Sequence, residues 1–243
     1  MRVLRAGGRY LEGREQRLWT GLIAVGAIGL GGSVLVILNP TTSRFPQWTA
    51  IVAIIAATMS AGMKVARRLT SVRKGRLGER LVTHRLHSLS DEYWLVNDVV
   101  LPRGRGNVDH VLIGPCGVVV IETKRLAGRI RCDGDEWFVN GWRRESISRQ
   151  VNSGASAVRC YLAECHPDLV PTALRWIESI VVFTHPTCRF EVNRARTTVV
   201  RYSSVLEVVL ELARKHHLVP SDASRLAASL AASQASEPVR GSP

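Results

Sequence analysis

Cysteines are few in this sequence, and their positions match no common framework. Five occur in 243 residues: Cys116, Cys132, Cys160, Cys165 and Cys188. No pair has the close spacing of a zinc site, and an odd number without a regular pattern excludes the disulfide framework of a small secreted domain. We therefore expect a protein of a reducing compartment, in which each cysteine is a small buried hydrophobe.

Acidic residues are scarce relative to basic ones. The chain has 20 Asp and Glu against 33 Lys and Arg, a net charge of +13. This excess favours a polyanionic partner, either nucleic acid or anionic lipid. Lysine is also rare: arginines outnumber lysines 29 to 4, which is typical of a GC-rich bacterial genome.

Charged side chains are almost missing from residues 18–63, where Arg44 is the single exception. Residues 18–38 and 45–63 are each long enough to cross about 30 Å of hydrocarbon as a helix, and Asn39 and Pro40 form a helix stop between them. The sequence predicts a hairpin of two transmembrane helices in the lipid bilayer. Its first half contains glycines that allow close helix packing: Gly21, Gly26, Gly29, Gly31 and Gly32.

Basic residues flank this hairpin at both of its ends. They are Arg2, Arg5, Arg9, Arg14 and Arg17 before it, and Lys64, Arg67, Arg68, Arg73, Lys74 and Arg76 after it. The positive-inside rule then places both termini in the cytoplasm, in a multi-pass protein of the bacterial cytoplasmic (inner) membrane. Two alternatives stay open: a cleavable signal peptide, although 17 residues precede the first run and VILNPTTS has no small-x-small cleavage site, and two buried helices of a soluble core.

The rest of the chain has the element order of an α/β domain. We expect helices at 74–89, 147–164, 171–176, 203–216 and 221–234, and strands at 93–102, 108–114, 117–124, 180–183 and 197–200, with short strands on either side of a DGDE turn at 133–136. The predicted organisation is a basic N-terminus (1–17), the hairpin (18–63), a basic linker (64–72), one domain (73–219), and a weak helix with a disordered tail (220–243).

The stretch VDHVLIGPCGVVVIETK, residues 108–124, carries charges among valines and isoleucines. If Pro115 and Cys116 form the turn, the numbers of paired residues sum to 231, and Asp109 lies opposite Glu122. Two carboxylates about 5 Å apart on an apolar face repel each other unless a proton or a cation lies between them. Oxygen ligands of this kind suit Mg²⁺ or Mn²⁺, with Lys124 beside a metal-bound water. The alternative is a solvated sheet face with ordinary ion pairs.

His110 points to the opposite face of the same strand, together with Val108, Leu112, Ile121 and Thr123. A packed or hydrogen-bonded histidine is therefore the prediction at this position, rather than a metal ligand.

Taken together, these motifs resemble the nuclease-related domain (NERD) family, a branch of the restriction-endonuclease-like PD-(D/E)xK nucleases. In chain order they are GRLGERLV at 75–82, NDVVLP at 97–102, NVDHVLIGPCGVVVIETKRLAGRI at 107–130, DGDEW at 133–137, Gln150, and VVFTHP at 181–186. The resemblance covers about residues 73–219, and it implies a central mixed β-sheet flanked by helices.

The same resemblance implies a set of site residues. Asp109 and Glu122, with the backbone carbonyl of Thr123, would hold Mg²⁺ (or Mn²⁺), and Lys124 would be the catalytic lysine. Two further residues have plainer alternatives. Glu79 would be the acidic residue of the first core helix, or else an exposed residue paired with Arg76 or Arg80. Gln150 would support the site, or else lie on the surface, because Ser148-Arg149 stand where relatives often have Asn-Pro.

Basic and aromatic side chains near these strands suit nucleic acid. The arginines are Arg103, Arg105, Arg125, Arg129 and Arg131, with a solvated loop as the alternative for each. Stacking on unpaired bases is one interpretation of three tryptophans, Trp137, Trp142 and Trp176. Core packing is the favoured interpretation for each.

The sequence thus predicts a membrane-anchored, metal-dependent nuclease that hydrolyses phosphodiester bonds of DNA, the favoured substrate, or RNA. One alternative is a catalytically silent nucleic-acid-binding or scaffold module tethered to the membrane. Another is a basic segment at 64–76 that binds anionic lipid, although this leaves Asp109 and Glu122 unexplained.

Overall fold

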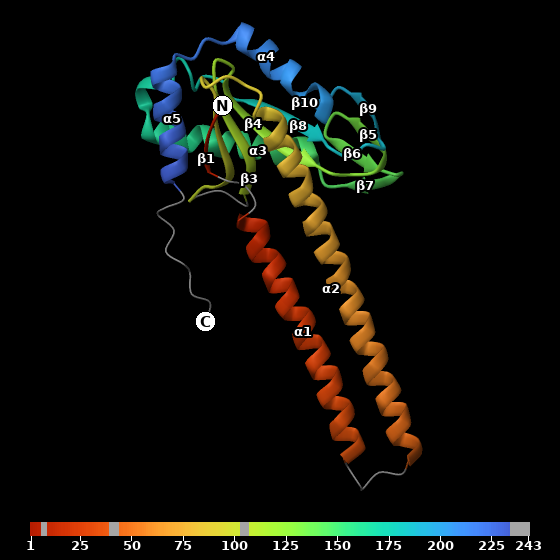
Figure 1. Ribbon diagram of the computed structural model, residues 1–243. Helices are drawn as coiled ribbons and strands as arrows, with labels where there is room; N and C mark the ends of the chain where they lie inside the picture. The colour runs from red at the N-terminus through yellow and green to blue at the C-terminus, as the bar shows by residue number, and fades with distance from the viewer. Residues whose placement is uncertain (6–8, 39–43, 103–106, 234–243) are drawn as a thin grey trace. The chain divides into compact units, whose positions relative to one another are not determined.

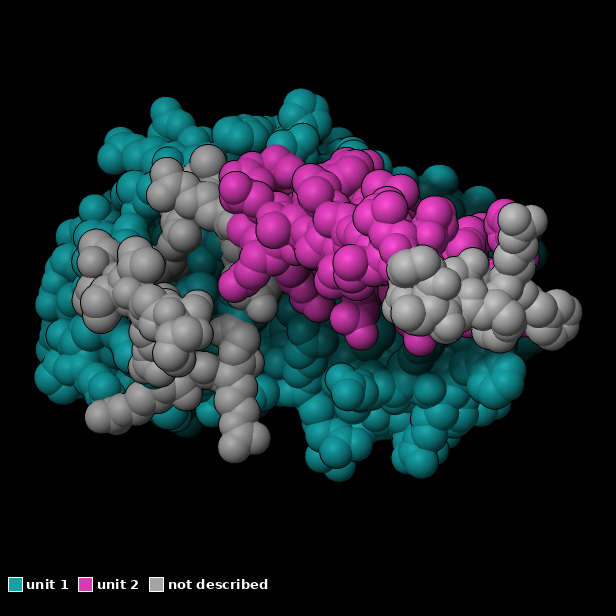
Figure 2. Space-filling model, turned by 90° about the horizontal axis from the view of Figure 1, so that it is seen from below, with its two compact units in different colours: residues 1–9, 77–243 teal, residues 10–76 magenta. Residues whose placement is uncertain are grey.

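The computed structural model describes residues 1–5, 9–38, 44–102 and 107–233. The chain divides into two compact units, coloured separately in Figure 2. The helical unit consists of Tyr10–Arg76, and the sheet unit consists of Met1–Arg9 together with the chain from Leu77 onward. The predicted helix stop at Asn39 and Pro40 and the tail from residue 234 lie outside the described residues.

The helical unit contains helix α1 (Arg9–Leu38) and most of helix α2 (Arg44–Leu86). Both helices are long and apolar enough to cross a membrane, by length and composition. In their most apolar windows only 6% and 0% of the residues are buried, whereas a core helix of a soluble protein would be mostly buried. The predicted linker at 64–72 is helical and belongs to α2.

Two of the six glycines of α1 lie at its contact with α2. A Cβ atom added at Gly29 would collide with the side chain of Thr58, and one added at Gly32 would lie 3.7 Å from Ile54. By contrast, an added Cβ at Gly21, Gly26 or Gly31 would meet no atom within 4 Å. Close packing of the two helices therefore depends on Gly29, because only a residue without a side chain fits against Thr58.

The sheet unit is built on a six-stranded mixed sheet with the order β1-β2-β3-β4-β8-β10 (Figure 1). Its strands are β1 (Arg2–Arg5), β2 (Trp94–Val100), β3 (Asn107–Gly114), β4 (Gly117–Lys124), β8 (Glu178–Phe183) and β10 (Thr198–Arg201). Strands β2, β3 and β4 pair antiparallel, whereas β1, β8 and β10 pair parallel with their neighbours. This is the predicted fold class, a mixed sheet flanked by helices, consistent with a restriction-endonuclease-like core.

Helices cover both faces of this sheet, which explains why its central strands are almost continuously apolar. Helices α3 (Ile147–Cys165) and α5 (Pro220–Ala232) contribute to the core on one face, and the end of α2 and helix α4 (Val205–Lys215) contribute to the core on the other. Cys116, Cys132 and Cys188 are buried as expected. The expectation was wrong for Cys160 and Cys165, which are exposed on α3.

A smaller second sheet has the order β7-β6-β5-β9. Its strands are β5 (Gly128–Asp133), β6 (Glu136–Val139), β7 (Trp142–Arg144) and β9 (Cys188–Asn193). The predicted turn between β5 and β6 is present, with Gly134 at a φ of 60°. Strand β9 was not predicted, because it joins the sheet only by parallel pairing with β5, far away in the sequence.

The N-terminal residues also form a strand that the sequence pattern does not reveal. Strand β1 pairs parallel with β2, with Val3 opposite Leu95, and the Arg2 N–H donates to the carbonyl of Tyr93 at 2.8 Å. A four-residue segment, RVLR, is too short to show a strand period of its own. The predicted basic N-terminus therefore contributes an edge strand to the sheet unit before the chain enters α1.

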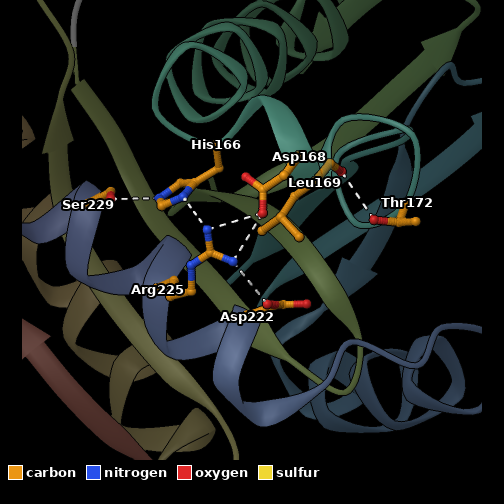
Figure 3. A network of polar contacts seen from close by, with 7 residues as sticks. All are labelled: His166, Asp168, Leu169, Thr172, Asp222, Arg225 and Ser229. Atoms are coloured by element: carbon orange, nitrogen blue, oxygen red, sulfur yellow. Dashed lines mark hydrogen bonds and ion pairs between the residues drawn. The ribbon is translucent and has the colours of Figure 1, made fainter.

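Helix α5 is part of the core rather than a weak terminal helix. Its residues Leu226 and Leu230 are fully buried. Figure 3 shows a polar network that fastens it to the end of α3, in which Arg225 lies 3.1 Å from Asp168 and the ring of His166 lies 2.8 Å from the hydroxyl of Ser229. The helix predicted at 171–176 is wrong: turns and bends follow the short 3-10 helix η1 (Pro167–Leu169) in this segment.

Substitution of Gly29, which lies against Thr58, and of Gly31, which has no such neighbour, tests the packing of α1 on α2. Gly29→Val should lower the Tm of the full chain in detergent micelles, because overpacking typically costs about 1–3 kcal/mol. Gly31→Val makes the same change where an added side chain meets no neighbour, so it should have a much smaller effect. Equal losses in the two variants, measured by thermal unfolding, would contradict this packing.

Candidate active site

The hairpin of β3 and β4 has the predicted register. Paired residues run from Gly114 with Gly117 to His110 with Ile121, and every pair sums to 231. Asp109 and Glu122 are the next residues on the two strands. There the Thr123 N–H donates to Asp109 Oδ2 at 2.8 Å, so the Asp109 carboxylate is held against the backbone of β4.

Three side chains on β4 and α3 form a closed set of hydrogen bonds. Lys124 Nζ donates to Glu122 Oε1 at 2.6 Å and to Gln150 Oε1 at 2.9 Å, and Gln150 Nε2 donates to Glu122 Oε1 at 2.7 Å. Gln150 lies in the first turn of α3, where the Ser146 side chain caps the helix by accepting from the Arg149 N–H. Although Gln150 is exposed, its amide is therefore fixed at the site by both of its ends.

Glu79 approaches the site from the last turns of α2. It is buried, at 9% relative exposure, so the alternative of an exposed helix residue is wrong. Its neighbour Gly78 explains how the helix comes so close, because a Cβ there would lie only 2.9 Å from Thr184 Oγ1 and 3.0 Å from the side chain of Thr123. The helix thereby brings a third carboxylate near enough to Asp109 for its negative charge to raise the pKa of Asp109.

The electrostatics of the site raise the pKa of Asp109 well above its usual value. Removal from water is the largest cause, followed by the negative charges of Glu122 and Glu79. The Thr123 N–H and the Lys124 ammonium lower the pKa, but they do not offset these effects. The protein alone therefore leaves its carboxylates incompletely neutralised.

The donor set fits a hard divalent cation. Within the described residues, Asp109 Oδ1 and Glu122 Oε2 accept no hydrogen bond, so each carboxylate keeps an oxygen for a further ligand. A hollow of about 210 Å³ lies beside Glu122 and Gln150. In the same described part of the chain, no three His, Cys, Asp or Glu side chains form a complete metal-binding cluster. A cation here would rely on two carboxylates and backbone or water oxygens.

A buried polar network supports the site from the reverse face of the sheet. His110 Nδ1 lies 2.6 Å from Asn97 Oδ1, and His110 Nε2 lies 3.2 Å from Thr123 Oγ1. Burial lowers the pKa of His110 to about 3, so the ring is neutral at pH 7 and donates to Asn97 while it accepts from the Thr123 hydroxyl. The prediction of a hydrogen-bonded histidine is confirmed. The network joins β2, β3 and β4 directly behind Glu122 and Lys124.

The alternation of side chains breaks down beside this network. Asp98 has a φ of 51°, a left-handed conformation that is uncommon for a residue other than glycine. Asn97 consequently lies with His110, whereas Val99 packs in the core on the α3 side. Val108, expected on the His110 face, also packs on the α3 side, where a Cβ at Gly154 would lie 3.2 Å from it.

The arginines predicted to contact nucleic acid differ in whether they lie next to the site and in what they bind. Arg125 Nη1 donates to the carbonyl of Thr184 at 3.1 Å, next to the site strand. Arg129 is paired with Glu191 at 2.8 Å, and the Arg131 guanidinium lies 4.6 Å from the ring centroid of Phe138. Arg103 and Arg105 lie outside the described residues.

The three tryptophans weighed as base-stacking residues also differ. Trp137 is fully buried and donates to Ser148 Oγ at 3.0 Å, as core packing predicts. Trp142 and Trp176 are 76% and 69% exposed, so the favoured expectation of core packing was wrong for both. No periodic pattern surrounds either residue, and only the tertiary structure reveals their exposure.

Removal of the Asp109 charge should stabilise the metal-free protein at pH 7. The pKa of Asp109 is higher in the folded than in the unfolded state, so the contribution of this one group to wild-type stability is most favourable below about pH 4 and becomes less favourable as the pH rises. Asp109→Asn mimics the neutral carboxyl and should raise the Tm at pH 7, measured with a chelator present. This gain should vanish near pH 4.

Asp91→Asn is the control for this measurement, because the N-terminal amine lowers the pKa of Asp91 and the variant should show no gain at pH 7. A Tm for Asp109→Asn below that of the wild type at pH 7 would contradict the repulsion at the site.

Comparison with known proteins gives one match, to a protein family. Residues 74–184 match the family model of the nuclease-related domain. No curated protein and no solved structure matches the chain significantly. The matched segment contains Glu79, Asp109, Glu122, Lys124 and Gln150. The chain therefore contains a nuclease-related domain of the NERD family at residues 74–184.

Proposed function

We propose that this protein is a membrane-anchored, metal-dependent nuclease that hydrolyses phosphodiester bonds of DNA or RNA. The observation that carries the proposal is the arrangement around Glu122, where Lys124 and Gln150 are hydrogen-bonded to one of its oxygens and the Asp109 carboxylate accepts from the N–H of the next residue, Thr123. A scaffold would gain nothing from these carboxylates, because without a cation they repel each other.

Asp109 and Glu122, with the backbone carbonyl of Thr123, would hold Mg²⁺ or Mn²⁺. The bound metal would supply a Lewis acid and a water of lowered pKa. Each carboxylate is already oriented through its other oxygen, Asp109 by the Thr123 N–H and Glu122 by Lys124 and Gln150. Little rearrangement is then required on metal binding, and the site is preorganised.

Lys124 is the residue that we propose to act on the phosphate. An ammonium group has three donors, and two of them are used by Glu122 and Gln150. The third is available to a phosphate oxygen, where the positive charge would stabilise the negative charge that develops in the transition state. Gln150 positions the ammonium, and Glu79 adds negative charge that favours metal binding.

The helical unit would anchor this site to the membrane, with residues 18–63 in the bilayer. Strand β1 supports the hairpin topology, because both ends of the helical unit are joined to the sheet unit, and the chain must then cross the bilayer an even number of times. The basic residues beside both spans favour the cytoplasmic side for these ends, by the positive-inside rule. Cleavage after the first span would also remove β1 from the sheet, which argues against a signal peptide.

Protease protection tests this orientation. In inside-out vesicles of the inner membrane, added protease should digest the sheet unit, whereas in intact spheroplasts the sheet unit should be protected. Digestion in spheroplasts but not in inside-out vesicles would contradict the cytoplasmic placement. A tag at the C-terminus reports the outcome by immunoblot.

The nuclease activity is tested on the purified full chain, since truncation before the helices would delete β1. The chain should cut DNA or RNA with Mg²⁺ or Mn²⁺, and Lys124→Ala should reduce the rate at least about 100-fold, the usual effect of losing one such electrostatic contact. Lys215→Ala is the matched control, because Lys215 pairs with Glu211 on the exposed side of α4. Cutting that survives Lys124→Ala would contradict the mechanism.

Calorimetric titration with Mn²⁺ separates the nuclease from a silent binding module. The wild type should bind the ion and Asp109→Asn should bind it more weakly. A chain that binds nucleic acid but shows neither metal binding nor cutting would favour the silent module.

A further inference from the structure

A second hollow lies at the edge of the large sheet, apart from Glu122. It has a volume of about 780 Å³ and lies between α3, the segment before β8, and β10. Its floor is polar and internally bonded: Ser179 Oγ donates to Asn152 Oδ1 at 2.6 Å, and the Thr197 hydroxyl donates to the Ser179 carbonyl at 2.8 Å. We call this hollow the β10 groove.

The side chains that line the β10 groove carry excess positive charge. The lining contains three arginines, Arg159, Arg175 and Arg196, and one acidic residue, Glu178, so its net charge is +2. Arg159 is anchored by its Nε to the carbonyl of Leu174 at 2.8 Å, and Arg196 lies 3.6 Å from Asp135. The Arg175 guanidinium has no ion-pair or hydrogen-bond partner among the described residues, so its charge is available to a ligand.

Trp176 adds an aromatic surface to this charge. Trp176 is 69% exposed. It lines the β10 groove and also another hollow, of about 400 Å³. An indole ring that is open to solvent next to arginines is the combination that binds unpaired bases, because the ring stacks on the base while the guanidinium groups hold the phosphates.

The surroundings of Trp142 provide an internal comparison. This residue is 76% exposed, but it does not line the hollow of about 880 Å³ beside β7. That hollow has three arginines and three acids in its lining, so its net charge is zero. Within the described residues, Trp176 thus lines a hollow with an excess of positive charge, whereas Trp142 does not line the neutral hollow beside β7.

The β10 groove lies close to the candidate active site. On α3, Asn152 of the groove is two residues from Gln150 of the site. In the parallel pairing of β4 with β8, Glu178 is opposite Val119 and Val181 is opposite Glu122, which separates the two levels by about 10 Å along the strands. A nucleic-acid strand in the groove is therefore within a few nucleotides of Glu122.

We infer that the β10 groove binds single-stranded nucleic acid, with one base stacked on Trp176 and phosphates held by Arg175 and its neighbours. A single strand fits better than a duplex, because the faces of paired bases are covered by their neighbours in the stack. The inference rests on the proposed function only in its choice of nucleic acid as the partner. It assigns a binding site separate from the residues that would perform cleavage.

Fluorescence anisotropy of the full chain in detergent micelles tests this site. The probe is a fluorescein-labelled oligo(dT) of about 20 nucleotides, longer than the span that one such site covers, and EDTA prevents cutting. Trp176→Ala should weaken binding about 5- to 100-fold, the usual effect of losing one stacked base. Trp142→Ala is the control of similar exposure and should leave the affinity unchanged. Binding of a fluorescein-labelled DNA duplex should be the same in all three proteins.

The charge is tested by the salt dependence of the same binding. Arg175→Ala should reduce the slope of log affinity against log salt by about 0.7, the value for one phosphate contact with a single strand. Arg194→Ala should leave the slope unchanged, because Arg194 is paired with Asp133 at 2.8 Å. The inference would be overturned if the two tryptophan variants had equal effects on oligo(dT) binding, or if the slope were unchanged in Arg175→Ala. It would also be overturned if Trp176→Ala lost only the binding of another protein.

Binding in EDTA and cutting with Mn²⁺ separate this inference from the proposed nuclease. Loss of oligo(dT) binding in Trp176→Ala would support the groove even if the wild type cut no substrate. Conversely, a wild type that cuts DNA and whose binding does not depend on Trp176 would support the nuclease and overturn the groove.

Discussion

Repulsion between Asp109 and Glu122 is the interaction on which the rest of the site depends. The two-residue turn between Gly114 and Gly117 sets the register of β3 and β4, in which His110 pairs with Ile121, and Asp109 and Glu122 are the next residues on the two strands. Glu79 adds to the repulsion from α2, and the pKa of Asp109 rises as a result. This conflict is the observation behind the divalent cation that we propose, because the charge and the oxygen preference of such an ion match the site.

The surroundings hold these acids in place despite their repulsion. On one face, Lys124 and Gln150 fix Glu122, and on the other the buried Asn97, His110 and Thr123 bind one another across three strands. Their hydrogen bonds are strong because they are shielded from water. The left-handed backbone at Asp98 is a local strain that permits this arrangement, since it turns Asn97 and Val99 to opposite faces.

The assembly of the sheet also determines how the helical unit is joined to the unit that contains the site. The large sheet uses residues from the beginning of the chain in β1, from its middle in β2, β3 and β4, and from further along in β8 and β10, and α5 covers one face. The helical unit is therefore an insertion between an edge strand and the body of the sheet. Both of its ends therefore continue into the same folded unit.

The sequence by itself determined most of the local elements and the candidate residues of the site. The two-residue turn predicted the β3–β4 register, and helical spacing predicted α3 and α4, because these features depend on neighbours in the chain. The apolar helices also followed from composition. Asp109, Glu122 and Lys124 became the candidate residues through the strand register and the family resemblance.

The tertiary structure decided everything that depends on distant partners. Strands β1 and β9 are short and gain their hydrogen bonds only from β2 and β5, and α5 looked weak because its buried leucines are interrupted by alanines and serines. The bonds of Gln150 to Glu122 and Lys124 could not be predicted from spacing, since they cross between two elements. The exposure of Trp176 beside Arg175 likewise emerged only after folding, because burial is a property of the surroundings of a residue and not of the residue itself.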